Sequence, residues 1–194
     1  MTVHVADGLV SPSMCRHISD ELTFAYWSRS TVVDADGRNG HVSTQRTSDT
    51  AHARYFTSEL ARLIGDVERS VRHVFGLAAG SLTGWQALRY GPRSGFELHH
   101  DDVSGRLGRA SSVVVFIETP AGGGELHFPD QDLTIEPAAG TAVAWTNWWP
   151  DRIGTTLAQH RVLPVHAGTR VSLVNWSTAT PILNTSRQDS YPST

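Results

Sequence analysis

After Gly80 the chain divides into short segments rich in Val, Ile, Thr and aromatic residues, and Gly, Pro or Asp separates one segment from the next. Short strands at such spacing, with turn residues between them, are typical of double-sheet β folds. The sequence therefore predicts a mainly β fold, a double-stranded β-helix (jelly roll), packed against two N-terminal helices. The eight predicted strands lie at 84–90, 95–101, 111–118, 124–128, 132–136, 140–146, 159–165 and 169–176.

The first eighty residues contain two amphipathic helix patterns. Ser11-Pro12 offers an N-cap followed by proline at the first helical position, which predicts a helix over roughly 12–27. A second set of apolar residues recurs at steps of three and four and ends before Gly76, a C-capping residue, which predicts a helix over 58–75.

The remaining segments complete the expected organisation. The polar segment 28–50 is expected to form a hairpin or a mobile loop, because turn residues lie between two short apolar pairs. At 194 residues the chain suits one domain. We expect this domain at 1–180, with a helical part at 1–80, a jelly roll at 81–180 and a flexible tail at 181–194.

Composition excludes several function classes. All sixteen basic residues are Arg, which excludes lysine Schiff bases and the P-loop lysine. The net charge of −3, without a block of like charges, argues against a nucleic-acid partner. No signal peptide and no run of ~20 apolar residues is present, so we expect a cytoplasmic protein without a membrane partner. Cys15 is expected to be a buried, inert thiol. No pattern specifies an oligomeric state.

A metal-binding pattern lies in the second predicted strand. His99 and Asp101 stand two positions apart, so both face one side of a strand about 6.6 Å apart. His160 can supply a third ligand. Two imidazoles and one carboxylate leave the opposite positions open, as in non-heme Fe(II) oxygenases. His100 and Asp102 permit a second register, and strand alternation makes the two registers exclusive.

An ordered set of motifs surrounds this pattern. Tyr90, Phe96, His99 and Asp101 follow the order Tyr, aromatic, His-x-Asp. The later motifs are Gly-Gly-Gly-Glu-Leu-His-Phe-Pro at 122–129, Ile-Glu-Pro-Ala-Ala-Gly at 135–140, and the segment from His160 to Arg170 that contains Pro-Val and Gly. Over about residues 84–176 this set resembles the prolyl 4-hydroxylase-like branch of the Fe(II)/2-oxoglutarate dioxygenases. A single His-x-Asp pair is a weak signal, whereas the ordered set is specific.

The resemblance implies a jelly roll that uses Fe(II), 2-oxoglutarate and O2, with ascorbate as a stimulant. It selects as catalytic iron ligands His99, Asp101 and His160. It also implies that Arg170 holds the distal carboxylate of 2-oxoglutarate, which a guanidinium can bind through two parallel hydrogen bonds. Many prolyl hydroxylases have Lys at this position. Ser172 lies on the same strand face and offers a second donor, and Tyr90 matches a position that lines the cosubstrate pocket.

Substrate contacts are predicted with less guidance from the motifs. The predicted contacts are His127, Trp148, Trp149, Arg152 and Trp176, together with Arg109 and Glu97. The adjacent pair Trp148-Trp149 lies between two predicted strands, where two large apolar rings suggest a pocket or lid. His100 and Asp102 are expected to support the ligands, to face the substrate or to lie on the surface. His166 is expected to be structural, and His52 and His73 are assigned no role.

The reaction implied by the resemblance is hydroxylation of an unactivated C–H bond, with 2-oxoglutarate converted to succinate and CO2. Asp101 argues against halogenation, because the related halogenases have a small residue there. The short chain has no peptide-binding domain, which favours a small-molecule substrate, a free amino acid or a related specialised metabolite. Two alternatives are a peptidyl-proline hydroxylase and a cupin-type metal protein that does not use 2-oxoglutarate.

Overall fold

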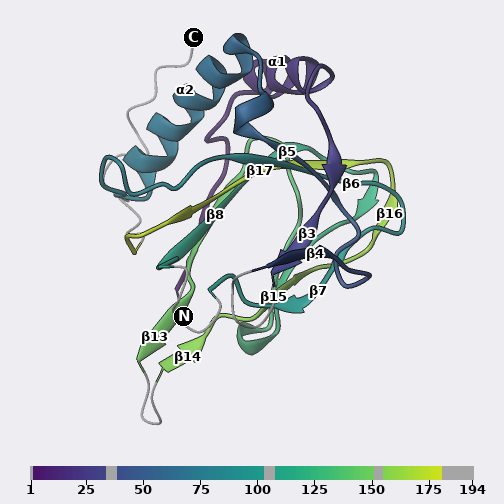
Figure 1. Cartoon of the computed structure of the whole chain (residues 1–194). Coiled ribbons are helices and arrows are strands. Elements are labelled where there is room, and N and C mark those ends of the chain that lie inside the picture. Colours follow the sequence, from purple (N-terminus) through teal and green to yellow (C-terminus); the bar gives the residue numbers. More distant parts are fainter. Residues whose placement is uncertain (1, 34–38, 103–107, 151–154, 181–194) are drawn as a thin grey trace.

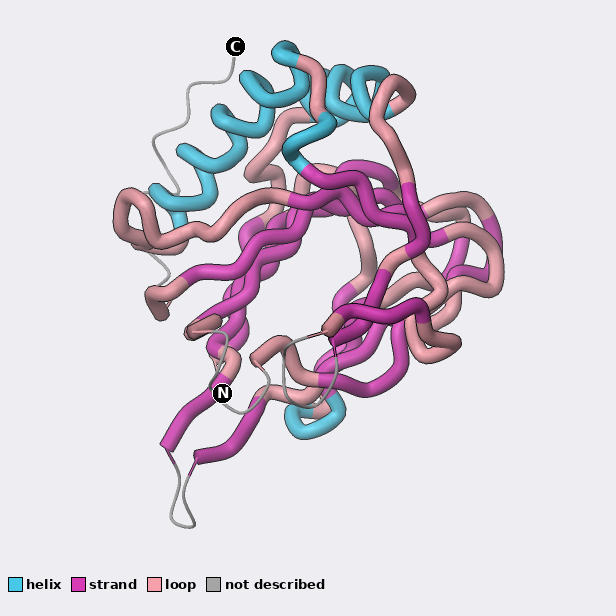
Figure 2. Tube along the Cα trace, in the orientation of Figure 1, coloured by secondary structure: helices cyan, strands magenta, loops and turns pink. Residues whose placement is uncertain are grey.

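The computed structural model describes residues 2–33, 39–102, 108–150 and 155–180. Two antiparallel sheets face each other, and both helices cover the outer side of the larger sheet (Figures 1 and 2). This arrangement confirms the predicted jelly roll with two helices. None of the described helices is long and apolar enough to cross a membrane.

The larger sheet has seven strands. In spatial order they are β1 (Val3–Ala6), β12 (Ala142–Thr146), β8 (Ser111–Glu118), β17 (Arg170–Ser177), β6 (Gln86–Tyr90), β5 (Asp49–His52) and β2 (Ser28–Arg29). β8 has the predicted bounds. Strands β1, β2 and β5 were not predicted as part of the jelly roll, and they extend its larger sheet with residues that precede Gly80.

The smaller sheet has four strands, and three two-stranded pairs complete the β structure. The smaller sheet contains, in spatial order, β11 (Leu133–Ile135), β10 (Leu126–Phe128), β15 (His160–Val162) and β7 (Phe96–His99). The pairs are β3 (Thr31–Val33) with β4 (Gly40–Val42), β9 (Gly122–Gly123) with β16 (Val165–Ala167), and β13 (Trp148–Pro150) with β14 (Thr155–Leu157). Two 3-10 turns lie at Ala53–Tyr55 and Pro129–Gln131.

Most predicted strands differ from the observed ones by one or two residues at an end, and two differ in ways that affect the site. The predicted strand 159–165 is divided into β15 and β16, which pair with different strands on either side of Pro164. Proline lacks the N–H that a continuous ladder would require. The predicted strand 95–101 ends at His99, so Asp101 lies in a bend beyond β7. The predicted hairpin within 28–50 is present as β3 and β4.

The two helices begin where the sequence predicts. Helix α1 spans Pro12–Leu22, and the Ser11 side chain accepts a hydrogen bond from the Met14 amide. The predicted end at residue 27 was too late, because the Trp27 indole N–H donates to the Leu22 carbonyl and the chain then enters β2. Helix α2 spans Ser58–Val74, and Gly76 follows it with a φ of 62°, which suits the left-handed position after a helix.

Side-chain alternation on the larger sheet creates two cores. Along β8, Val113, Val115 and Ile117 pack against the helices, whereas Val114 and Phe116 pack against the smaller sheet. Strand β17 alternates in the same way, so its inner face presents Arg170, Ser172, Val174 and Trp176. The polar side chains of Arg170 and Ser172 therefore lie in the space between the two sheets. Burial of such groups costs free energy unless they form hydrogen bonds.

The turn at Gly123 requires glycine. Its φ is 75°, and a Cβ atom there would overlap the Pro164 carbonyl oxygen and lie 2.8 Å from the His166 amide nitrogen. We expect Gly123→Ala to lower the free energy of unfolding by about 2 kcal/mol or more. Gly91→Ala is the matched control, because no atom lies within 4 Å of its added Cβ. Urea unfolding measures both, and equal stability of the two variants would contradict the requirement.

Candidate metal centre and adjoining pocket

Three potential ligands meet between the sheets. His99 ends β7, and His160 lies opposite it in the antiparallel pairing of β7 with β15. The Asp101 carboxylate reaches both imidazoles, with 3.8 Å between Oδ1 and His99 Nε2 and 3.7 Å between Oδ2 and His160 Nε2. The three ligand atoms all lie within 4.8 Å of one another. The structure therefore brings together the predicted set.

Neighbouring groups orient both imidazoles. His99 Nδ1 lies 2.7 Å from the Glu97 carbonyl oxygen, and its ring stacks on Phe96 with 3.5 Å between ring centroids. A proton on Nδ1 that is donated to this carbonyl leaves the Nε2 lone pair directed toward Asp101. The buried ring of His160 packs edge-to-face against Trp145, with 4.7 Å between centroids.

The charge states suit a divalent metal. Burial lowers the pKa of His160 and, together with the nearby His160 ring, lowers the pKa of His99 to about 3, so both imidazoles are neutral donors. Burial by itself would raise the pKa of Asp101, but His160, His99 and the Ser112 hydroxyl lower it to about 2. Two neutral imidazoles and one carboxylate are the donor set that Fe(II) accepts in non-heme oxygenases.

Two residues that sequence reasoning missed support Asp101. The Ser112 hydroxyl donates to Asp101 Oδ2, and the Asn147 amide lies 2.9 Å from the Ser112 hydroxyl. Asn147 also donates to the Arg109 carbonyl oxygen. Ser112 and Asn147 are both buried. The available signal for Ser112 was a polar residue on the same strand face as the apolar residues Val114 and Phe116.

Arg170 is a buried cation on the inner face of β17. Its guanidinium donates to the Ser172 hydroxyl at 3.2 Å and to the Gly124 carbonyl oxygen at 3.0 Å. It also lies over the rings of Tyr90 and Phe116, 5.2 and 4.9 Å from their centroids. Burial lowers its pKa to about 10, so it remains charged at neutral pH. Within the described ranges no carboxylate forms an ion pair with it, a situation that suits an acidic ligand.

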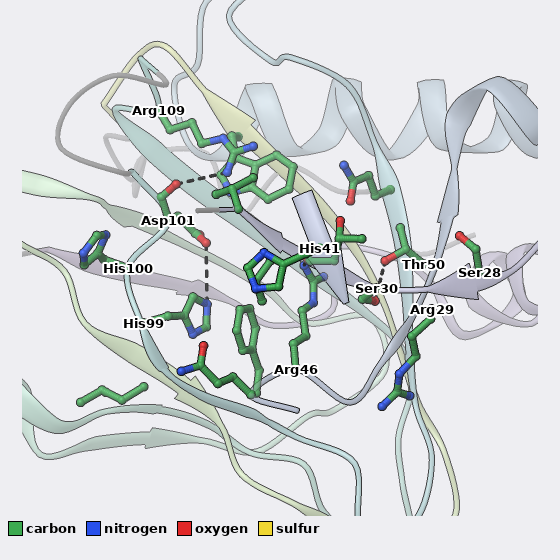
Figure 3. A pocket seen from close by; sticks show the side chains of 18 of the residues that line it. Ser28, Arg29, Ser30, His41, Arg46, Thr50, His99, His100, Asp101 and Arg109 are labelled. Atoms are coloured by element: carbon green, nitrogen blue, oxygen red, sulfur yellow. Dashed lines mark hydrogen bonds and ion pairs between the residues drawn. The ribbon is translucent and has the colours of Figure 1, made fainter. Parts of the chain in front are cut away.

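A cavity of about 760 Å³ adjoins the metal ligands (Figure 3). His99, Asp101, Arg109 and Trp176 line it, which places two of the predicted substrate contacts beside the cluster. Arg170, Ser172 and Tyr90 do not line this cavity and lie deeper between the sheets.

Segment 28–50 forms much of the other wall. This segment contributes residues of β2 and β3 together with His41 and Arg46. His52, which was assigned no role, also lines the cavity, because it belongs to β5 and not to a helix. His100 lines the cavity as well, whereas Asp102 is buried and does not lie on the surface.

Other predicted substrate contacts lie elsewhere. His127 lies on the outer side of β10, where its Nδ1 is 2.9 Å from the Thr134 hydroxyl, and Glu97 is exposed. Trp148 is 41% exposed on the β13–β14 hairpin and does not line the cavity. The Trp149 side chain and Arg152 are outside the described residues. Strand alternation explains His127, because its neighbours Leu126 and Phe128 occupy the inner face.

His166 and His73 lie outside the ligand cluster. His166 lies exposed in β16, and His73 belongs to helix α2.

Comparisons with known proteins agree with this geometry. The sequence model of the 2OG-Fe(II) oxygenase superfamily matches residues 85–178. The chain is 25% identical over 166 residues to prolyl 4-hydroxylase subunit alpha-1 of Gallus gallus, covering 80% of this chain and 32% of that protein. This chain therefore spans about a third of the length of that relative.

Solved structures show the same fold. The viral collagen prolyl hydroxylase of Paramecium Bursaria Chlorella virus-1, in its 2OG complex, has a TM-score of 0.63 at 18% identity and covers 91% of this chain and 95% of its own. A Pseudomonas putida prolyl-4-hydroxylase has a TM-score of 0.59 at 20% identity, covering 90% and 91%. The segment similar to the 2OG-Fe(II) oxygenase superfamily, residues 85–178, contains the His-Asp-His cluster and Arg170.

Proposed function

We propose that this chain is a 2-oxoglutarate-dependent hydroxylase that acts on an unactivated C–H bond of a small molecule, a free amino acid or a related metabolite. The observation that carries the proposal is the His99-Asp101-His160 cluster beside a cavity, with a buried guanidinium at Arg170 that has no ion-pair partner among the described residues.

The three ligands would hold Fe(II) from one side. His99 and His160 each offer Nε2, and Asp101 offers a carboxylate that Ser112 keeps in place. Fe(II) with 2-oxoglutarate and O2 supplies the oxidative chemistry, in which a C–H bond and O2 give an alcohol while 2-oxoglutarate gives succinate and CO2. Arg170 would bind the distal carboxylate, and the aromatic rings of Tyr90 and Phe116 exclude water around that contact.

A small substrate suits the cavity. About 760 Å³ falls in the range of ordinary small-molecule pockets. Peptidyl-proline hydroxylation is a second candidate, favoured by the similarity to prolyl 4-hydroxylase subunit alpha-1. A cupin-type metal protein without 2-oxoglutarate is the third, and the behaviour of Arg170 separates it from the first two.

The direct test is an anaerobic titration with Fe(II) and 2-oxoglutarate. We expect a weak visible absorption band that requires both components, because chelation of the iron by 2-oxoglutarate gives a charge-transfer transition. Fe(II) without 2-oxoglutarate should give no band. If the band fails to appear with both components present and iron bound, the proposed function is wrong.

Metal replacement gives a second prediction. The protein loaded with Zn(II) in place of Fe(II) should be folded and should release no succinate from 2-oxoglutarate, because zinc has no redox chemistry. Circular dichroism checks the fold, and succinate release under air checks turnover. Substrate conversion with Zn(II) alone would instead indicate a hydrolase or isomerase.

A further inference from the structure

The cavity beside the metal ligands is lined by positive charge. Arg29, Arg46 and Arg109 all line it, and Asp101 is the one carboxylate among its described lining residues. Since Asp101 belongs to the ligand cluster, it would be neutralised by the metal. A cavity with this balance of charge attracts an anion and disfavours a cation.

Arg46 is fixed beside the His99 side of the cluster. Its Nε donates to the Ser48 hydroxyl at 3.2 Å, and its Nη1 donates to the Thr31 carbonyl oxygen, also at 3.2 Å. Its guanidinium lies 5.0 Å from the centroid of Phe96, the ring that stacks on His99. The charge is therefore held one aromatic ring away from a metal ligand.

Arg109 is fixed on the Asp101 side. Its Nη1 donates to the Asp101 carbonyl oxygen at 3.1 Å, and its guanidinium lies 3.8 Å from the centroid of Trp176. Figure 3 shows Arg109 beside Asp101, and Arg46 toward His99. Both guanidinium groups line the same cavity.

We propose that the substrate is a small carboxylic acid whose carboxylate binds to Arg46 and Arg109. This inference rests on the proposed function and names its substrate class. A bound carboxylate would accept hydrogen bonds from both guanidinium groups. Arg29 is excluded, because it lies apart from the metal ligands (Figure 3). Arg170 is also separate from this site, since it lies deeper and does not line the cavity.

The test is a binding measurement that needs neither iron nor turnover. The Zn(II)-loaded protein, with and without 2-oxoglutarate, is titrated with free and N-acetylated amino acids and with the primary amide of each. Binding is followed by tryptophan fluorescence, since Trp176 lies against Arg109. We expect acids to bind at least about tenfold more tightly than their amides, equivalent to ~1.4 kcal/mol. Arg46→Gln and Arg109→Gln should each reduce this preference to about threefold or less.

Conservative variants separate charge from folding. Arg46→Lys should keep part of the acid preference, because it retains the charge and loses the planar fork. Arg161→Gln is the matched control, since Arg161 is exposed in β15 beside buried His160. The Arg161→Gln variant should prefer acids over amides by the same factor as the unmodified protein. The 2-oxoglutarate concentration for half-maximal band formation in the Fe(II) protein should be unchanged in Arg46→Gln.

Three outcomes would overturn the proposal. The first is a panel in which no acid binds or in which amides bind as tightly as acids. The second is an unchanged preference in folded Arg46→Gln and Arg109→Gln. The third is a weakened 2-oxoglutarate band in Arg46→Gln, which would assign this cation to the cosubstrate. Because the Fe(II) and 2-oxoglutarate band is measured separately, failure of the anion preference is distinguishable from failure of the proposed function.

Discussion

Asp101→Ala is expected to abolish 2-oxoglutarate-dependent turnover while leaving the fold nearly intact. Its carboxylate contacts both imidazoles, at 3.8 and 3.7 Å from their Nε2 atoms. Loss of a residue that only supports a metal ligand typically costs ~10–100-fold in metal affinity or activity, so loss of a ligand should exceed this range. Succinate release and iron content measure the effect, and circular dichroism measures the fold.

His99→Ala and His160→Ala should behave in the same way. His127→Ala is the matched control, because this histidine lies on the outer side of β10. The His127→Ala protein should retain activity. If His100→Ala removed activity and iron while His99→Ala did not, the ligand assignment would be wrong. The test is direct because both residues line the same cavity.

Arg170→Ala is expected to raise the 2-oxoglutarate concentration needed for half-maximal turnover by about two to three orders of magnitude. The variant would leave a buried carboxylate without its charged partner, which costs about 2–5 kcal/mol in comparable contacts, at about 1.4 kcal/mol per tenfold. Iron binding should persist, since Arg170 is not a member of the ligand cluster. Succinate release against 2-oxoglutarate concentration measures the shift.

Arg170→Lys should be partly tolerated, because it keeps the charge but loses the fork that reaches both Ser172 and Gly124. Arg161→Ala serves as the control for loss of an exposed arginine. Unchanged 2-oxoglutarate saturation in a folded Arg170→Ala protein would refute the anchor and favour the cupin-type alternative.

The sequence by itself determined the strand-rich half of the protein and its ligand set. Runs of β-forming residues, helical periodicity and turn residues are local properties, so β8 and helix α2 could be placed within a residue of their observed bounds. The spacing of His99 and Asp101 is equally local. His160 was found through the ordered motifs, and the pairing of β15 with β7 then brought it opposite His99.

Only the tertiary structure decided what surrounds the ligands. Ser112 reaches Asp101 because β8 lies in the larger sheet and directs that residue inward, and the sequence does not specify which face of a doubly buried strand faces the site. His52 reaches the cavity because β5 pairs with β6, and Arg46 reaches it because it forms an isolated bridge with Phe96 of β7. Local patterns show which residues of a strand share a face. The long-range pairing of strands decides which other residues that face contacts. This pairing places the arginines on the wall of the cavity.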